Sequence, residues 1–310
     1  MTASTGAFPK TELDAKTFQH KLEELTNTIA YKAQREGESK GLRPGFVAMD
    51  IYFQLQLANQ IYNLFFYLNA DQRRREDCDW KVAYSVAILP LVRTMIDCLF
   101  NVTAILQDPP YFGRWFRQSG YRYFMEALDQ DEARYSGQPR WDEYIAKYRG
   151  KTQFEIRRDG FHETAVRAAE KWPTLSRYVD DTKHCFPPNH QNFLKTLTLG
   201  FWKEYSGISH ATFNGLLPIA LFLSPKDLPH EQRPNVDSAS DGMISLHIAR
   251  VAAILLCMLT EVQARCRFDG ARINQRLREL WNTLIVVPEI KELYDERYSQ
   301  LMKEKGINAD

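Results

Sequence analysis

The chain has 310 residues, of which 44% are hydrophobic, 25% are charged and 13% are aromatic. This composition is typical of a folded globular protein and excludes a largely disordered one. The 40 basic and 39 acidic residues give a formal net charge of +1, which provides no long-range attraction to nucleic acid or to an anionic membrane.

Helical periodicity runs along most of the chain and is interrupted by glycine and proline. Between residues 46 and 69, for example, Ile51, Leu55, Ala58 and Tyr62 recur at three- and four-residue spacing. No run of alternating β-branched residues bounded by turns occurs, so the predicted class is all-α. We predict helices over residues 11–35, 46–69, 80–107, 111–135, 192–222, 240–267, 271–286 and 288–306, with shorter stretches around 141–149, 161–171 and 174–183.

This order of elements predicts a multi-helix bundle of about nine or ten helices, arranged in three parts. Residues 1–45 are expected to form an N-terminal helical arm and residues 46–268 the core bundle. Residues 269–310 are expected to form C-terminal helices that pack on the core. The segment 224–238 contains three prolines and is predicted to be an exposed loop.

Cysteine usage and the N-terminal segment predict a cytoplasmic protein. The five cysteines are odd in number and include no CxxC pair, which favours reduced thiols. Residues 1–16 lack the apolar core of a signal peptide. The two longest apolar stretches, 82–106 and 244–262, each contain charged residues, so we interpret them as core helices and expect no membrane association.

Two polar stripes cross these apolar helices. Arg93, Asp97 and Asn101 are four residues apart, and because four residues turn about 400° they share one helix face. Lys203, His210 and their neighbours form the second stripe, at spacings of three and four residues. Pro90 and Pro218 predict kinks beside the two stripes. The residues expected to support or bind at this site are Asn101, Lys203, Tyr205, Ser206, Ser209 and Asn214.

We hypothesise that the two helices pack together and place His210 beside Arg93 and Asp97, in a buried polar site. These three residues are the candidate catalytic residues. A carboxylate fixes the tautomer of an imidazole, and an arginine binds an anionic oxygen such as a phosphate. The alternative is a satisfied polar network that sets the register of the helices and does no chemistry.

The sequences LVRTMIDCL and EYSGISHATFNG carry a resemblance to a known family. With an Arg-x3-acid helix followed by a Ser/His helix, residues 51–262 resemble a bacterial all-α family of unknown function related to HEPN domains. The resemblance implies HEPN-like central helices, a role in stress or phage defence, RNA as a substrate and a homodimer. It indicates no particular protein partner.

Many HEPN proteins are metal-independent ribonucleases with an Arg-x4–6-His motif, and this chain departs from that motif. The positions that should hold the arginine before His210 are Lys203, Glu204 and Tyr205, so only Lys203 can replace it. Matches at Arg157 with His162 and at Arg177 with His184 are no more than chance predicts. Ribonuclease activity is therefore one candidate function. The rival is a non-catalytic protein that binds a partner or a small ligand.

The sequence indicates no metal or cofactor. A di-iron site needs repeated Glu-x2-His on facing helices, which the chain lacks. His184, Cys185 and His190 could ligate zinc but have no fourth ligand. The segment 112–123 alternates aromatic residues with three arginines and could stack bases, but an aromatic core with a solvated arginine edge is favoured.

Overall fold

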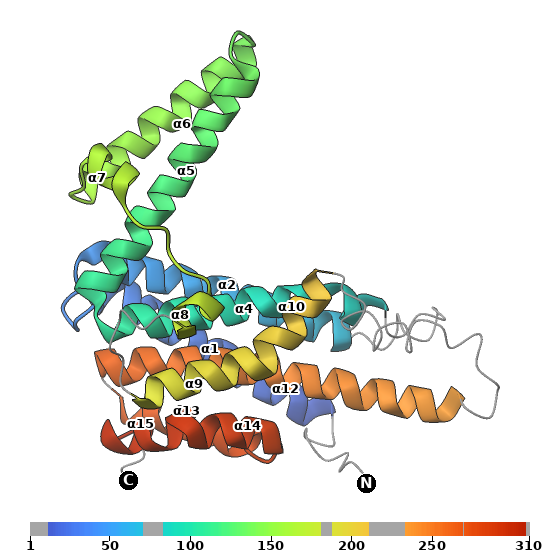
Figure 1. The fold of residues 1–310 in the computed structure, drawn as a ribbon. Coiled ribbons are helices and arrows are strands. Elements are labelled where there is room, and N and C mark those ends of the chain that lie inside the picture. Colours follow the sequence, from blue (N-terminus) through green and yellow to red (C-terminus); the bar gives the residue numbers. More distant parts are fainter. Residues whose placement is uncertain (1–11, 71–82, 181–187, 211–232, 269, 308–310) are drawn as a thin grey trace.

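The computed structural model describes residues 12–70, 83–180, 188–210, 233–268 and 270–307. These residues form helices and turns without any strand, which confirms the predicted all-α, multi-helix bundle (Figure 1). The α-helices are α1 (Glu12–Glu36), α2 (Gly45–Ala70), α4 (Ala83–Gln107), α5 (Arg114–Tyr135), α6 (Pro139–Arg158), α7 (Glu163–Ala168), α8 (Leu175–Asp180), α9 (Pro188–Leu197), α10 (Lys203–Ser209), α12 (Arg233–Cys266), α13 (Ala271–Leu284), α14 (Pro288–Leu293) and α15 (Ser299–Glu304). Three π-helical turns, η1 (Pro109–Gly113), η2 (Thr198–Trp202) and η4 (Tyr294–Tyr298), join neighbouring helices.

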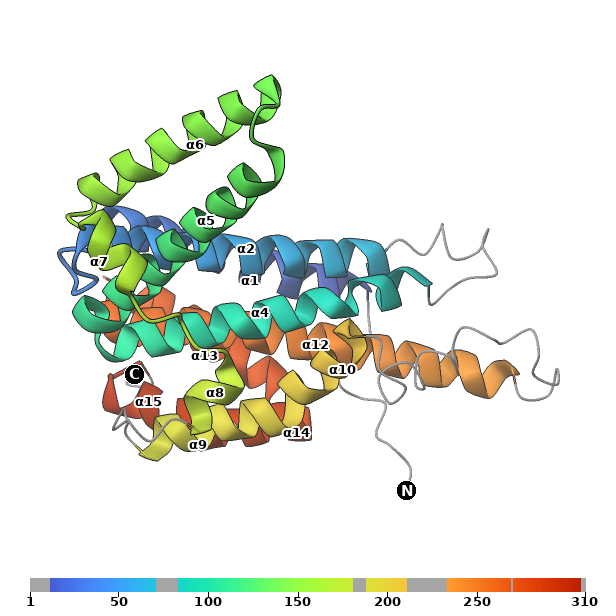
Figure 2. The ribbon, with the colours of Figure 1, turned by 45° about the horizontal axis from the view of Figure 1, so that its top comes forward.

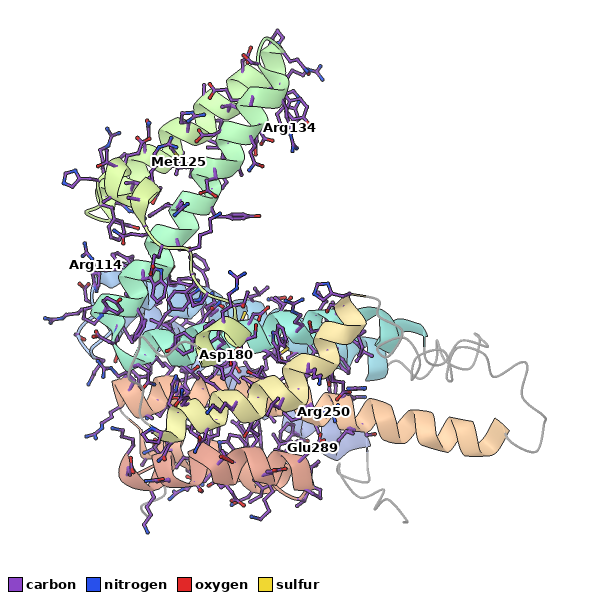
Figure 3. All side chains as sticks on the ribbon, viewed as in Figure 1. Arg114, Met125, Arg134, Asp180, Arg250 and Glu289 are labelled. Atoms are coloured by element: carbon purple, nitrogen blue, oxygen red, sulfur yellow. The ribbon has the colours of Figure 1, made fainter. Side chains whose placement is uncertain are left out.

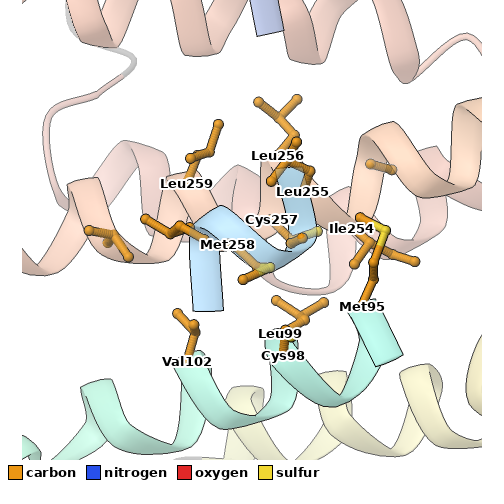
Figure 4. Packing of buried hydrophobic residues seen from close by; sticks show 14 of the residues in the cluster. Met95, Cys98, Leu99, Val102, Ile254, Leu255, Leu256, Cys257, Met258 and Leu259 are labelled. Atoms are coloured by element: carbon orange, nitrogen blue, oxygen red, sulfur yellow. The ribbon is translucent and has the colours of Figure 1, made fainter. Parts of the chain in front are cut away.

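The core is built around α12, which packs lengthwise against α4, α2 and α1 (Figures 1 and 2). Figure 4 shows Leu99 and Val102 of α4 facing Met258 of α12, and all three side chains are fully buried. The spans Ile88–Gln107 and Ser245–Cys266 are long and apolar enough to cross a membrane, but they are 67% and 83% buried inside the fold. Their composition is therefore that of core helices.

In the described part of the predicted N-terminal helical arm, residues 1–45, the main element is α1. Leu22, Leu25 and Ile29 of α1 are fully buried in the main hydrophobic cluster, so α1 is a core helix. α1 can pack there despite its many charged residues, because a one-sided apolar stripe is enough to bury one face of a helix. At the other end of the chain, Leu277 and Trp281 of α13 enter the same cluster.

The part that projects from the bundle is an antiparallel pair, α5 and α6, with α7 beside its base (Figures 1 and 2). We call residues 114–168 the hairpin. At its tip, Gly137 has a φ of +85°, a conformation that a side chain disfavours. At its base, a Cβ on Gly113 would come 2.5 Å from the Val47 side chain, so glycine allows the chain to approach α2 as it leaves the core.

Several predicted boundaries differ from the structure, and the helix predicted around 141–149 extends over Pro139–Arg158. α12 begins at Arg233, so the last part of the predicted loop 224–238 is helical, with Pro234 in the first turn where a missing N–H costs nothing. The predicted helix over 192–222 begins at Pro188 and continues through η2 and α10 to Ser209. Residues 211–232, and with them Asn214 and Pro218, lie outside the described residues.

Candidate functional site

The two predicted polar helices do pack together, α10 lying across the first half of α4. Ser209 lies at the crossing: its hydroxyl donates to the Tyr205 carbonyl at 2.9 Å and lies 3.5 Å from the Pro90 carbonyl. Pro90 is inside α4, where its ring disturbs the helical hydrogen bonding. The contact places the C-terminal end of α10 over the middle of α4.

Arg93 and His210 meet at this crossing, 117 residues apart in the sequence. The Arg93 Nη1 lies 2.8 Å from the His210 Nε2. Because a guanidinium can only donate, Nε2 must accept, which puts the imidazole proton on Nδ1 in this arrangement. His210 is exposed, so the bridge between the two helices lies at the surface.

Asp97 contacts the arginine rather than the histidine. Its Oδ2 lies 3.9 Å from the Arg93 Nε, and its Oδ1 accepts from the Trp202 indole N–H at 3.4 Å. The Trp202 ring also lies against the Arg93 guanidinium, at 5.2 Å. Burial raises the pKa of Asp97, and the nearby Arg93 opposes this rise. The expected carboxylate–imidazole contact is therefore absent from the described contacts of Asp97.

The other predicted residues take different positions. Asn101 accepts from the Trp172 indole N–H at 2.9 Å, which ties α4 to the segment after α7. Ser206 is buried and Lys203 is exposed on the same helical run as His210. Asn214 lies outside the described residues, as stated above.

The predicted burial of the site is wrong. The side chains of Arg93 and Asp97 are 24% and 43% exposed, so the stripe lies at the rim of the core and not inside it. The sequence pattern could not show this, because exposure depends on the segments that pack on that face of α4, among them α10 and the segment around Trp172. Among the described residues, the stripe is therefore partly exposed and His210 is exposed.

Tyr205 belongs to a second, buried cluster. Its hydroxyl lies 2.6 Å from the His247 Nδ1, and both side chains are inside the core. Burial, together with nearby Arg250, lowers the pKa of His247 to about 3. Tyr205 therefore anchors α10 to α12 and does not face the Arg93 stripe.

Arg250 joins three helices beside this pair (Figure 3). Its Nη1 lies 2.9 Å from a Glu204 carboxylate oxygen on α10, and its Nε and Nη2 bind Glu289 on α14 at 2.5 and 2.9 Å. A further buried pair links Arg297 to Glu261 through two hydrogen bonds. Sequence reasoning did not find these pairs, although charged residues within the apolar stretch 244–262 were their visible signal.

The hairpin is attached to the core through a third buried cluster. Arg117 of α5 lies 3.0 Å from Asp50 of α2 and 3.0 Å from Asp159 at the end of α6. The Tyr121 hydroxyl donates to Asp159 at 2.6 Å. Burial raises the pKa of Asp50 to about 7, although Arg117 opposes the rise. Arg117 of the aromatic–arginine segment is thus paired inside the fold and not on the solvated arginine edge that we favoured, whereas Arg114 and Tyr123 are exposed.

Within the described parts of the chain, no three His, Cys, Asp or Glu side chains gather closely enough to hold a metal ion. The Arg93–His210 stripe has instead a guanidinium, an imidazole and an indole beside the Asp97 carboxylate, and the guanidinium is the group that can bind an anion. No protein-family model, curated protein or solved structure matches this chain, and its relationship to HEPN domains stays a prediction.

Proposed function

We propose that this chain is a cytoplasmic, HEPN-related bacterial protein of stress or phage defence that cleaves RNA without a metal ion. The observation that supports the proposal is the surface bridge from Arg93 to His210, 2.8 Å long. Arg93 can bind a phosphate and His210 can act as an acid or a base. Because His210 is exposed, we expect an RNA strand to reach this bridge.

Metal-independent cleavage needs a base for the RNA 2′-hydroxyl and a cation for the charge that develops on the phosphate. His210 supplies the first group through the lone pair of Nε2, and Arg93 supplies the second. In the free protein Arg93 donates to that lone pair. A phosphate that draws the guanidinium to itself therefore also frees His210 to accept a proton.

Neighbouring residues set the position of Arg93. Asp97 and Trp202 hold the guanidinium from two sides, and the Trp202 ring is half-buried beside it. Lys203 precedes His210 by seven residues, which is two helical turns or about 10 Å on the same face. Being exposed, it offers a second cation for the next phosphate along the strand.

The test is cleavage of a labelled single-stranded RNA by the purified full-length protein in excess EDTA. Wild type should release products ending in a 2′,3′-cyclic phosphate. His210→Ala should lower the rate by about 100-fold or more, the usual contribution of a positioned acid–base group. Arg93→Met should weaken both RNA binding and cleavage.

A matched control is Arg276→Met on α13, which removes a half-buried arginine paired with Glu24 at 2.9 Å. It should leave cleavage unchanged. Phage challenge of a bacterial host that expresses wild type or the Arg93→Met/His210→Ala double variant tests the biological role. Equal cleavage by wild type and His210→Ala, or no cleavage by either, contradicts the proposal.

The alternative function, a non-catalytic protein that binds a partner or a small ligand, has its own support. Asp97 bonds to Trp202 and Asn101 bonds to Trp172, so two members of the stripe tie helices together. If the stripe is only architectural, His210→Ala and Arg93→Met lower the melting temperature without any specific functional loss. Melting curves of the same variants separate the two functions.

We also propose a homodimer, supported by an exposed apolar stripe on α2. Phe53, Leu57 and Leu64 are 58%, 46% and 41% exposed, and their spacings of four and seven residues put them on one face. Such a stripe is a candidate for burial against a second copy. Light scattering should give twice the chain mass for wild type and the monomer mass for Phe53→Asp.

A further inference from the structure

A pocket of about 470 Å³ is lined by residues from the ends of α4 and α12, from α15 and from the start of α9. Gln107, which lines it, is 14 residues beyond Arg93 on the same helix. At 1.5 Å per residue this places the pocket about 20 Å from the Arg93–His210 stripe. It is a separate site.

The lining of this pocket carries a net positive charge. The lining contains four basic side chains and two carboxylates, which gives a net charge of +2. The two carboxylates are Glu261 and Glu304. Both carboxylates are already engaged, Glu261 by Arg297 and Glu304 by the Gln300 amide at 2.7 Å. The remaining basic side chains make no ion pair or hydrogen bond with any described residue, and they are Arg265, Arg267 and Lys305.

Arg297 is a fixed cation at the inner side of the pocket. It is paired with Glu261 through Nε and Nη2, its guanidinium lies 5.6 Å from the Phe193 ring centroid, and its side chain is only 10% exposed. A group held in this way is oriented before a ligand arrives, so little conformational freedom is lost on binding.

Arg267 has a backbone conformation that its residue type does not favour. It follows the last turn of α12 with a φ of +46°, and its N–H closes the helix on the Gln263 carbonyl at 2.8 Å. Glycine takes this helix-ending position at less steric cost. The negative end of the α12 dipole favours a cation near the end of the helix. The dipole does not explain why this cation is at residue 267, where the backbone conformation disfavours any side chain.

The rest of the lining suits the non-phosphate part of a ligand. Leu106, Ala264 and Leu301 form an apolar wall. The carboxamides of Gln107, Asn189 and Gln300 offer hydrogen-bond donors and acceptors, with the Asn189 amide donating to Gln300 at 3.0 Å. The volume is within the range of about 300–1,000 Å³ that small-molecule sites occupy.

We propose that this pocket binds a phosphorylated small molecule of the nucleotide class. Its phosphate groups lie against Arg265, Arg267 and Lys305, because guanidinium groups bind phosphate oxygens in pairs. Its base or sugar lies against the carboxamides and the apolar wall. The ligand is a free nucleotide and not an RNA strand, because the pocket gathers its cations around one small volume instead of along a track.

The experiment is calorimetric titration of the full-length protein with ATP, ADP, pyrophosphate, adenosine and a short RNA oligonucleotide. ATP or ADP should bind, and adenosine should bind at least about tenfold more weakly, since it lacks the charged groups. Binding of none of the phosphorylated compounds overturns the proposal, as does binding of the oligonucleotide without any mononucleotide. Pyrophosphate that binds as tightly as ADP overturns the assignment to nucleotides.

Arg267→Gly is the decisive variant because it removes a cation and also relieves the backbone at φ +46°. Nucleotide binding should weaken by at least about tenfold while the melting temperature stays equal or rises. The matched control is Arg272→Ser, which removes one exposed arginine from α13 outside the pocket. Unchanged binding in Arg267→Gly, or an equal loss in Arg272→Ser, overturns the site.

Discussion

The core and the hairpin of this molecule reach their stability by different routes. The core buries one continuous apolar cluster drawn from every long helix of the bundle. The hairpin buries a cluster of four residues, Met125, Ile156, Phe161 and Val166. It is held to the core and to itself by ion pairs, among them those of Arg117 and Arg149, and by aromatic packing such as that of Phe161 on Phe46.

A helical hairpin can thus be regular while it leaves large apolar side chains exposed. The hairpin leaves Tyr123 and Phe154 exposed at 73% and 59%, yet its helices are regular along their length. Since apolar burial is the main favourable term in folding, the hairpin should be the less stable unit and should open before the core. Four predictions test this difference.

The largest effect is expected in the core, at Leu259 of α12, which is fully buried (Figure 4). Leu259→Ala removes apolar contacts and leaves a cavity, so the free energy of unfolding should fall by about 3–5 kcal/mol. Urea denaturation followed by far-UV circular dichroism measures the change. As the matched case, Met125→Ala in the hairpin should lower local protection against hydrogen exchange and shift the global midpoint far less.

The junction between the two regions should give the next largest effect. Arg117→Met leaves Asp50 and Asp159 buried without their shared cation, which should cost about 2–3 kcal/mol. Hydrogen exchange should show the loss in α5 and α6 first. Adding Asp50→Asn to this variant should recover part of the loss, and a double variant as unstable as the single one contradicts the account.

The junction with the hairpin and the interior of the core should respond to pH in opposite directions, through Asp50 of α2 and His247 of α12. Burial raises the pKa of Asp50 to about 7. The folded state therefore keeps a proton that the unfolded chain loses near pH 4. As a result, the contribution of Asp50 to the free energy of unfolding falls as pH rises from about 4 to 7. Burial lowers the pKa of His247 to about 3, so its contribution is complete above about pH 6.5 and falls as pH decreases.

The measurement is urea denaturation of wild type, Asp50→Asn and His247→Gln between about pH 5 and 7. As pH falls, the stability of wild type relative to Asp50→Asn should rise, and relative to His247→Gln it should fall. Each slope should be at most about 1.4 kcal/mol per pH unit, the limit for one proton. Two slopes of the same sign would show that the assigned groups do not control the profile.

The smallest effect belongs to the surface ion pairs of the hairpin. Arg149 binds Asp129 and Glu132, each at 2.8 Å. Because these carboxylates are well exposed, Arg149→Met should cost about 0.5–1 kcal/mol at low salt. Thermal melts in about 1 M NaCl should reduce the difference, since salt screens exposed charges. A cost that persists in high salt would mean that the arginine stem contributes by packing.

Much of the local structure could be predicted from the sequence. Apolar periodicity placed α2 and α4 within a few residues of their ends, and four-residue spacing placed Arg93 and Asp97 on one stripe. The expectation that α10 would bring His210 to Arg93 agrees with the geometry. These features depend on residues close together in the chain, whose relative positions the helix itself fixes.

Only the tertiary structure decided which helix faces meet and how deeply each is covered. Asp97 faces Trp202 and not His210, α1 is a core helix, and α5 to α7 project as a hairpin. Arg250 and Arg297 find their carboxylates about 40 residues away. How deeply a side chain is buried, and which residue it contacts, result from packing between segments that are distant in the chain. A periodic pattern predicts which face of a helix a side chain is on, but it does not predict which segment packs against that face.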